Sequence, residues 1–230
     1  MNHDDFKAQA GRAAATLVES GMTVGLGTGS TAAHAVRALA ERLARGEISA
    51  IQSVPTSEAT AVLARSLSLP LIPLPAEGVD LAIDGADEVT AGLELIKGLG
   101  GALLREKVVE HRARRFVVVA DISKRVHQLG ERSPLPIEVV SFGYRAVLSD
   151  LAEFGDPKLR MDGDELYFTE NGHLIVDLHT GPIDDPSSLD FELKGIPGVV
   201  ETGLFLGMAD LALIGGPDGV ETLNRSEGGT

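Results

Sequence analysis

The sequence predicts an α/β protein with a doubly wound, mostly parallel sheet and a smaller α+β part. In the first half of the 230 residues, short apolar runs alternate with helical patterns, the order expected for a parallel sheet covered by helices. The prolines of residues 133–136 mark a boundary. Beyond it the predicted order changes to β-α-β-β-α-β, which is typical of a small unit of sheet and helices.

The first half begins with a helix in which Phe6, Ala10, Ala13 and Leu17 recur at helical spacing before a stop at Gly21. The elements predicted after it are a strand through Val24 and Leu26, a helix carrying Val36, Leu39 and Leu43 that ends at Gly46, and strands at residues 48–54, 71–74, 79–83 and 116–120. Helices are expected between several of these strands, so this half is predicted to be doubly wound.

The second half is predicted to contain a strand at residues 137–140, a helix at 144–154, strands at 166–168 and 174–178, a helix that starts at Asp185, and a strand at 199–206. Asn171 and Gly172 form a strong hairpin signal between the two middle strands. The apolar run 211–214 is expected to rejoin the first sheet. We therefore predict a catalytic α/β domain of residues 1–132 plus 207–230, and a small α+β domain of residues 133–206 that serves in oligomerisation.

Composition narrows the class of protein. Thirty-four acidic residues against 20 basic ones give a net charge of −14, which repels nucleic acid and anionic membranes, so a phosphate ligand would need a local positive site. The absence of cysteine excludes disulfides, thiolate metal sites and a cysteine nucleophile. The amino-terminal residues lack the pattern of a signal peptide and no apolar run is long enough to cross a bilayer, so we predict a cytoplasmic protein.

The turn GLGTGST, residues 25–31, lies between a predicted strand and a predicted helix. Free backbone N–H groups at a helix start attract anions, and the hydroxyls of Thr28, Ser30 and Thr31 can add hydrogen bonds. Gly27, Gly29 and the following Ala32 also fit a loose dinucleotide pattern, although the acidic ribose-binding partner and the Walker lysine are absent. A phosphate site, an NAD site and a purely structural turn all remain open.

A second segment, residues 84–107, combines carboxylates, lysines and a glycine-rich turn. Asp84 falls where the predicted strand 79–83 ends, a position well placed for chemistry. Asp87 and Glu88 follow closely. The alternatives are a solvated acidic turn, a magnesium site of one or two carboxylates, or carboxylates whose internal cation is the nearby lysine. The six histidines show no zinc-binding pattern.

Glu106 stands in the helical pattern that follows the glycine-rich turn, between Lys97 and Lys107. A glutamate near a helix start is favoured by the helix dipole and can simply be exposed. However, helical geometry places it near Ala102, Leu103 and Val109, so part of its surroundings is apolar. Burial would raise its pKa toward neutrality, with nearby lysine opposing the shift, and would make Glu106 a better general base.

Together these blocks resemble type A ribose-5-phosphate isomerase, whose members interconvert ribose 5-phosphate and ribulose 5-phosphate. The resemblance covers nearly the whole chain. It is carried by GLGTGSTAAH at 25–34, DGADEV at 84–89, KGLGGALLREK at 97–107, VADISK at 119–124, and ADLALIGGPDGV at 209–220. Each block alone is only moderately specific, whereas the combination is highly specific.

The resemblance implies an enediolate mechanism without cofactor or metal, and a homodimer or homotetramer. It assigns Glu106 as the base and Asp84, Asp87 and Lys97 as further catalytic residues. The implied sugar-phosphate contacts are Lys7, Thr28, Gly29, Ser30, Thr31, Asp84, Gly85, Ala86, Asp87, Lys97, Gly98, Leu99, Gly100 and Lys124.

Two kinds of alternative stay open at this point. Leu99, Gly101 and Leu104 depart from the family's usual KGGGAALTREK, which leaves the shape of the turn open. A sensor that binds sugar phosphates, a transferase with a nucleophilic glutamate, and an NAD-dependent enzyme are the rival functions.

Overall fold

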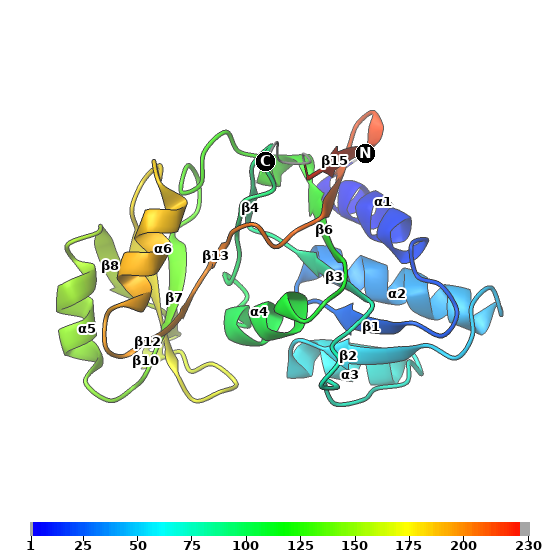
Figure 1. Cartoon of the computed structure of the whole chain (residues 1–230), viewed down its shortest axis with the longest axis horizontal. Helices are drawn as coiled ribbons and strands as arrows, with labels where there is room; N and C mark the ends of the chain where they lie inside the picture. Colours follow the sequence, from blue (N-terminus) through cyan, green and yellow to red (C-terminus); the bar gives the residue numbers. More distant parts are fainter. Residues whose placement is uncertain (1, 226–230) are drawn as a thin grey trace.

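The computed structural model describes residues 2–225 and contains a six-stranded sheet in the order β15-β14-β6-β3-β1-β2 (Figure 1). Its strands are β1 (Thr23–Leu26), β2 (Gln52–Pro55), β3 (Leu81–Gly85), β6 (Phe116–Asp121), β14 (Leu211–Gly216) and β15 (Gly219–Asn224). All neighbouring pairs are parallel except β14 and β15, which are antiparallel. The predicted mostly parallel α/β fold is confirmed.

Helices cover one face of this sheet, and a helix together with short strands and loops covers the other. The helices of this part are α1 (His3–Ala15), α2 (Ser30–Ala44), α3 (Glu58–Ser66) and α4 (Leu103–His111), with a short 3₁₀ helix η1 (Ile122–Lys124) after β6. Along β6, Val117 and Val119 pack in the core cluster under α1 and α2, whereas Phe116 and Val118 pack with Val109 of α4. Because both faces are buried, β6 is apolar at consecutive positions rather than alternate ones.

A second sheet, in the order β12-β7-β11-β8, lies apart from the first with α5 and α6 beside it (Figure 1). Its elements are β7 (Leu135–Val139), α5 (Tyr144–Leu151), β8 (Asp156–Leu159), β11 (Leu174–His179), α6 (Pro186–Lys194) and β12 (Val199–Thr202). This gives the predicted β-α-β-β-α-β order. The shorter strands β4 (Glu88–Val89), β5 (Leu95–Ile96) and β13 (Leu204–Phe205) form a three-stranded sheet, and β9 (Met161–Asp162) pairs with β10 (Glu165–Leu166).

Several predicted elements are wrong in detail. Residues 71–74 form no strand, because only Leu71 bridges to Ser53. The run 166–168 is not the second strand of the smaller sheet: β8 takes that place, and Phe168 makes only an isolated bridge with Leu174. The run 199–206 divides into β12 and β13, which belong to different sheets.

Other boundaries move, and one strand was missed. The first helix ends at Ala15 rather than continuing through Leu17. Strand β2 begins at Gln52, later than predicted. Run 211–214 does rejoin the first sheet as β14, but the antiparallel edge strand β15 was not predicted. Within residues 2–225, no helix combines the length and apolar character needed to span a bilayer.

Candidate active site

A cleft of about 140 Å³ lies where the carboxyl ends of β1 and β3 meet the glycine-rich turn that precedes α4. Neighbouring parallel strands deliver their following loops to the same edge of a sheet, which explains why residues 25–31 and 84–87 converge there. The residues lining the cleft are Lys7, Thr28, Gly29, Ser30, Thr31, Gly85, Ala86, Asp87, Lys97, Gly98, Gly100, Glu106 and Lys124.

The turn between β1 and α2 is held against Asp84. A Cβ atom at Gly27 would lie 2.0 Å from Oδ1 of Asp84, so only glycine allows this approach. The backbone N–H of Thr28 donates to that same oxygen at 2.9 Å. Gly29 adopts a φ of 104° and directs the chain into α2, whose first residue is Ser30. The turn therefore presents the amino-terminal end of a helix to the cleft.

The hydroxyl of Thr28 was predicted to face an anion, but it is engaged within the protein. Its Oγ1 lies 2.8 Å from Oγ1 of Thr56 and 2.7 Å from Oγ of Ser57, the residue that caps α3. Ser30 remains at the cleft, where its Oγ accepts a hydrogen bond from Nζ of Lys7 at 3.0 Å. Lys7 and Lys124 thus supply positive charge from two separate elements, α1 and η1.

A buried cluster of charged groups forms the inner wall of the cleft. Nζ of Lys97 donates to the carbonyl of Gly85 at 2.6 Å and lies 2.9 Å from Oδ2 of Asp84. The same atom lies 3.5 Å from Oε2 of Glu106 and 3.4 Å from Oε1 of Glu110. All four charged side chains are at least 95% buried. One ammonium therefore faces three carboxyl groups in a nearly dry environment.

This environment shifts the titration of the cluster. Burial raises the pKa of Glu106 to about 8 against the opposing charge of Lys97, with Asp84 and Asp87 adding to the rise. Although burial acts to lower the pKa of Lys97, the neighbouring carboxylates raise it well above its ordinary value. Glu106 thus has the raised pKa that its apolar neighbours in the sequence predict and that suits a general base near neutral pH.

The glycine-rich turn is fixed from both sides. The N–H of Leu99 donates to Oδ2 of Asp87 at 2.9 Å, and Nη1 of Arg160 donates to the carbonyls of Gly98 and Leu99 at 2.9 and 3.0 Å. Arg160 is itself paired with Asp177 of β11, so the second sheet supports the turn.

The departures from the family pattern are accommodated in this turn. A Cβ atom at Gly101 would lie 2.1 Å from the hydroxyl of Tyr167, and φ is 80° at that position. Leu104 lines an apolar groove on the far side of α4, so it does not face the cleft. The substitution of the family's usual threonine by Leu104 therefore lies outside the candidate site.

Most of the predicted site residues meet in the cleft, with two exceptions. Asp84 is only 1% exposed and stands behind the lining, where it holds Lys97 and the turn at Thr28. The side chain of Leu99 is not part of the lining. Sequence reasoning missed Glu110 and Arg160. Glu110 had a usable signal, since it lies one helical turn after Glu106, whereas Arg160 is far away in the chain and had none.

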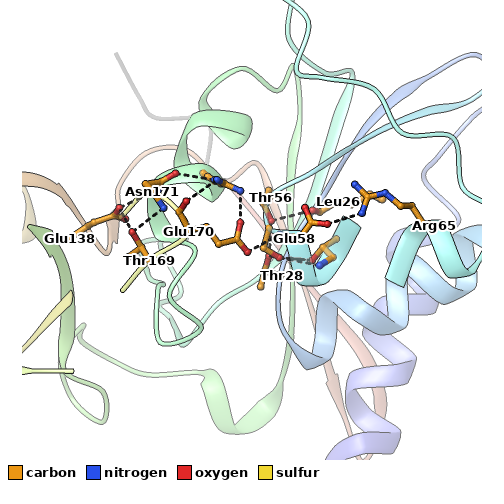
Figure 2. A network of polar contacts seen from close by, with 12 residues as sticks. Leu26, Thr28, Thr56, Glu58, Arg65, Glu138, Thr169, Glu170 and Asn171 are labelled. Carbon is orange, nitrogen blue, oxygen red and sulfur yellow. Dashed lines mark hydrogen bonds and ion pairs between the residues drawn. The ribbon is translucent and has the colours of Figure 1, made fainter. Parts of the chain in front are cut away.

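A network of polar contacts ties the second sheet to this site (Figure 2). Oε1 of Glu170 accepts from the N–H of Glu58, the first residue of α3, at 2.8 Å. Its other carboxylate oxygen accepts from Arg105, the neighbour of Glu106 on α4. Asn171 joins Arg105 to buried Glu138 on β7 through bonds of 3.0 and 3.2 Å. Residues 170 and 171 therefore link α4 to α3, the helix whose capping residue Ser57 contacts Thr28.

Replacing Glu170 by Ala is expected to lower kcat/KM for the reaction of this site by about threefold to tenfold, because a partly exposed charged contact contributes about 1 kcal/mol. Steady-state kinetics of Glu170→Ala, Arg105→Ala and the double variant measure the coupling. The two losses should be less than additive in free energy. Glu165→Gln, an exposed change on β10, is the control. Strictly additive losses would contradict a shared role.

Residues 2–225 contain no group of three or more histidine, aspartate or glutamate side chains arranged to hold a metal ion. The acidic residues 84 and 87 instead contact Lys97 and the N–H of Leu99. The pairing with Lys97 fits the internal-cation interpretation of Asp84.

A parallel sheet with a buried carboxylate–lysine cluster at its carboxyl edge, beside the amino-terminal end of a helix, defines an enzyme of the α/β class. The family model for ribose 5-phosphate isomerase A (phosphoriboisomerase A) matches residues 52–219. The chain therefore belongs to the ribose 5-phosphate isomerase A family.

Similar proteins agree over almost the full length. Ribose-5-phosphate isomerase A of Roseiflexus castenholzii is 55% identical, with 97% of each chain covered. A solved D-ribose-5-phosphate isomerase in complex with phospho-erythronic acid is 41% identical, with a TM-score of 0.95 over 98% of this chain and 100% of that one. The isomerase structure from Methanocaldococcus jannaschii is 42% identical, with a TM-score of 0.91 over 96% and 98%.

Proposed function

We propose that this protein is an aldose-ketose isomerase that interconverts D-ribose 5-phosphate and D-ribulose 5-phosphate in the non-oxidative pentose phosphate pathway. The observation that carries the proposal is the position of Glu106. It is a buried carboxylate 3.5 Å from a lysine, in a cleft whose other end has the features of a phosphate site. Family membership and a relative's complex with phospho-erythronic acid support a sugar-phosphate substrate.

The phosphate group would bind at the amino-terminal end of α2. Ser30 and Thr31 lie there beside Lys7, and Lys124 faces the same cleft. The helix N-terminus and these lysines offset the net charge of −14, which would otherwise repel a dianion. Binding of the phosphate fixes the sugar carbons relative to Glu106. The base and the carbon-bound proton are therefore held in a reactive geometry and need not meet by diffusion.

The chemistry is a proton transfer between adjacent carbons of the opened sugar. Ionised Glu106 removes the C2 proton of the aldose, which leaves an enediolate. The hydroxyl proton on O2 passes to O1, and Glu106 returns its proton to C1, which gives the ketose. Lys97 stabilises the negative charge that develops on the substrate oxygen. Asp87 lines the cleft and would orient hydroxyl groups, while Asp84 holds Lys97 from behind. No electron acceptor enters this scheme.

The direct test is incubation with ribose 5-phosphate in excess chelator, with ribulose 5-phosphate as the product measured. Formation of the ketose supports both the reaction and its independence from an exchangeable metal. A sugar-phosphate sensor would gain thermal stability with ribose 5-phosphate and leave it unchanged. A covalent intermediate trapped by hydroxylamine would favour the transferase, and NAD binding would favour the dehydrogenase.

The pKa of Glu106 predicts the pH dependence of the reaction. The base must be ionised, so kcat/KM should rise about tenfold per pH unit on the acidic side and level off above a pKa of about 8. The profile is measured with ribose 5-phosphate at low concentration, over a pH range above the phosphate pKa of about 6. A profile that is already flat from pH 6.5 upward would contradict a raised pKa for the base.

We also propose a domain division, an oligomeric state and a cellular location for this protein. Residues 133–206 are proposed as a separate small domain, because they contain all of the second sheet and both of its helices. A homodimer or homotetramer and a cytoplasmic location are proposed from the family resemblance and the composition. Light scattering of the purified chain tests the oligomeric state.

A further inference from the structure

Glu110 is a buried acid that the mechanism above does not use. It lies on α4 one helical turn after Glu106, on the side of the helix that faces Lys97. Its side chain has no exposed surface. Among the described residues, no donor reaches either of its carboxylate oxygens with hydrogen-bond geometry. An ionised carboxylate in such a place would lack the bonds that normally offset the loss of water.

The charges around Glu110 also disfavour its ionised form. Within residues 2–225, Lys97 is the only cation paired with these carboxyl groups, and it already contacts Asp84 at 2.9 Å and Glu106 at 3.5 Å. Asp84 accepts additional bonds from the N–H groups of Thr28 and Gly85, donors that Glu110 lacks. If Glu106 ionises to act as a base, a charge on Glu110 would bring a third negative group to one ammonium.

We propose that Glu110 is a positioning residue that remains a neutral carboxylic acid while Glu106 ionises. As an acid it has an O–H that can donate to the neighbouring Asp84. Its other oxygen gives the ammonium of Lys97 a neutral acceptor 3.4 Å away. Lys97 is thereby directed at the cleft without a further negative charge that would pull it inward. Burial, and the nearby charges of Asp84 and Glu106 against that of Lys97, raise the pKa of Glu110 well above its ordinary value, in agreement with this role.

The inference rests on the proposed isomerase reaction and predicts different outcomes for two replacements of similar size. Glu110→Gln keeps a donor and a neutral acceptor. It should retain kcat within about threefold, with the acidic limb of the kcat/KM profile moved by less than about half a unit. Glu110→Leu removes the acceptor, so kcat should fall about tenfold while KM changes less than about twofold. Glu41→Gln, an exposed change on α2, is the control.

A second measurement does not depend on activity. If Glu110 is neutral when folded and ionises near the ordinary glutamate pKa of 4.5 when unfolded, it weakens the wild type progressively above that pH. Glutamine lacks this effect, so the unfolding free energy of Glu110→Gln should increase relative to wild type between pH 5 and 9. Urea titrations at both pH values measure this difference.

These experiments distinguish a failure of the inference about Glu110 from a failure of the proposed isomerase function. If wild type makes no ketose, the proposed function fails, while the urea titrations still report the ionisation of Glu110. If wild type is active, three results would each overturn the inference. These are an acidic limb that moves by half a unit or more in Glu110→Gln, normal kcat in Glu110→Leu, and a stability difference that stays constant or shrinks with pH.

Discussion

Replacing Glu106 by Gln is expected to lower kcat for ribose 5-phosphate by about 10³-fold, the scale of a lost general base. Glutamine keeps the size of the side chain, and it can still contact Lys97, which lies 3.5 Å from the glutamate. Binding should therefore survive. Stopped or coupled assays of ketose formation measure the loss, and calorimetric titration with ribose 5-phosphate measures affinity, which should stay within about threefold.

The stability of this variant provides an internal control. Folded wild type keeps the Glu106 proton up to a pKa of about 8, whereas the unfolded chain releases it near 4.5. The wild type therefore loses stability as pH rises through this range, and Glu106→Gln does not. The variant should melt at a higher temperature than wild type at pH 9. Turnover close to wild type would reject Glu106 as the base, whatever the melting temperature.

Replacing Lys97 by Met is expected to have the second large effect, because it removes the ammonium from a cluster with three carboxyl groups. Breaking a buried ion pair from one side costs about 3–5 kcal/mol of stability. The loss should be greater at pH 9 than at pH 6, because the orphaned carboxyls can remain protonated more easily at the lower pH. Turnover should fall by about 10²-fold or more with the loss of oxyanion stabilisation.

Urea titrations at the two pH values and kinetics at the lower one test this expectation. Lys158→Met is the matched control, since Lys158 lies on β8 and is 61% exposed in its pair with Asp156. It should change stability by less than about 1 kcal/mol. Equal stability losses at pH 6 and pH 9 would show that Lys97 does not hold ionised carboxylates.

The sequence predicts those parts of the fold in which local patterns and tertiary structure agree. Strand β6 is apolar from Phe116 to Ala120 and is buried on both faces, so this run of residues was sufficient to place it. Run 71–74 is equally apolar but its carbonyls and N–H groups pair only near Leu71, so it is no strand. Strand β8 carries Pro157 and Lys158, which conceal its pairing with β11.

The candidate site was predictable where its residues lie in continuous motifs. Gly27 and Lys97 belong to such blocks, and both lie at the site. The engaged hydroxyl of Thr28 and the support from Arg160 were not predictable, because each depends on partners distant in the chain. The burial of Glu110 likewise follows from how α4 packs on β3, which a helical pattern alone does not define.

Arg160 also limits the motion of the glycine-rich turn. Because its guanidinium grips two carbonyls of the glycine-rich turn while pairing with Asp177, the turn cannot swing outward unless the second sheet moves with it. The glycine-rich turn thus already has its binding conformation in the unliganded protein, and substrate binding should need little change in the backbone. Speed of association would then be governed by diffusion and charge attraction rather than by the opening of a gate.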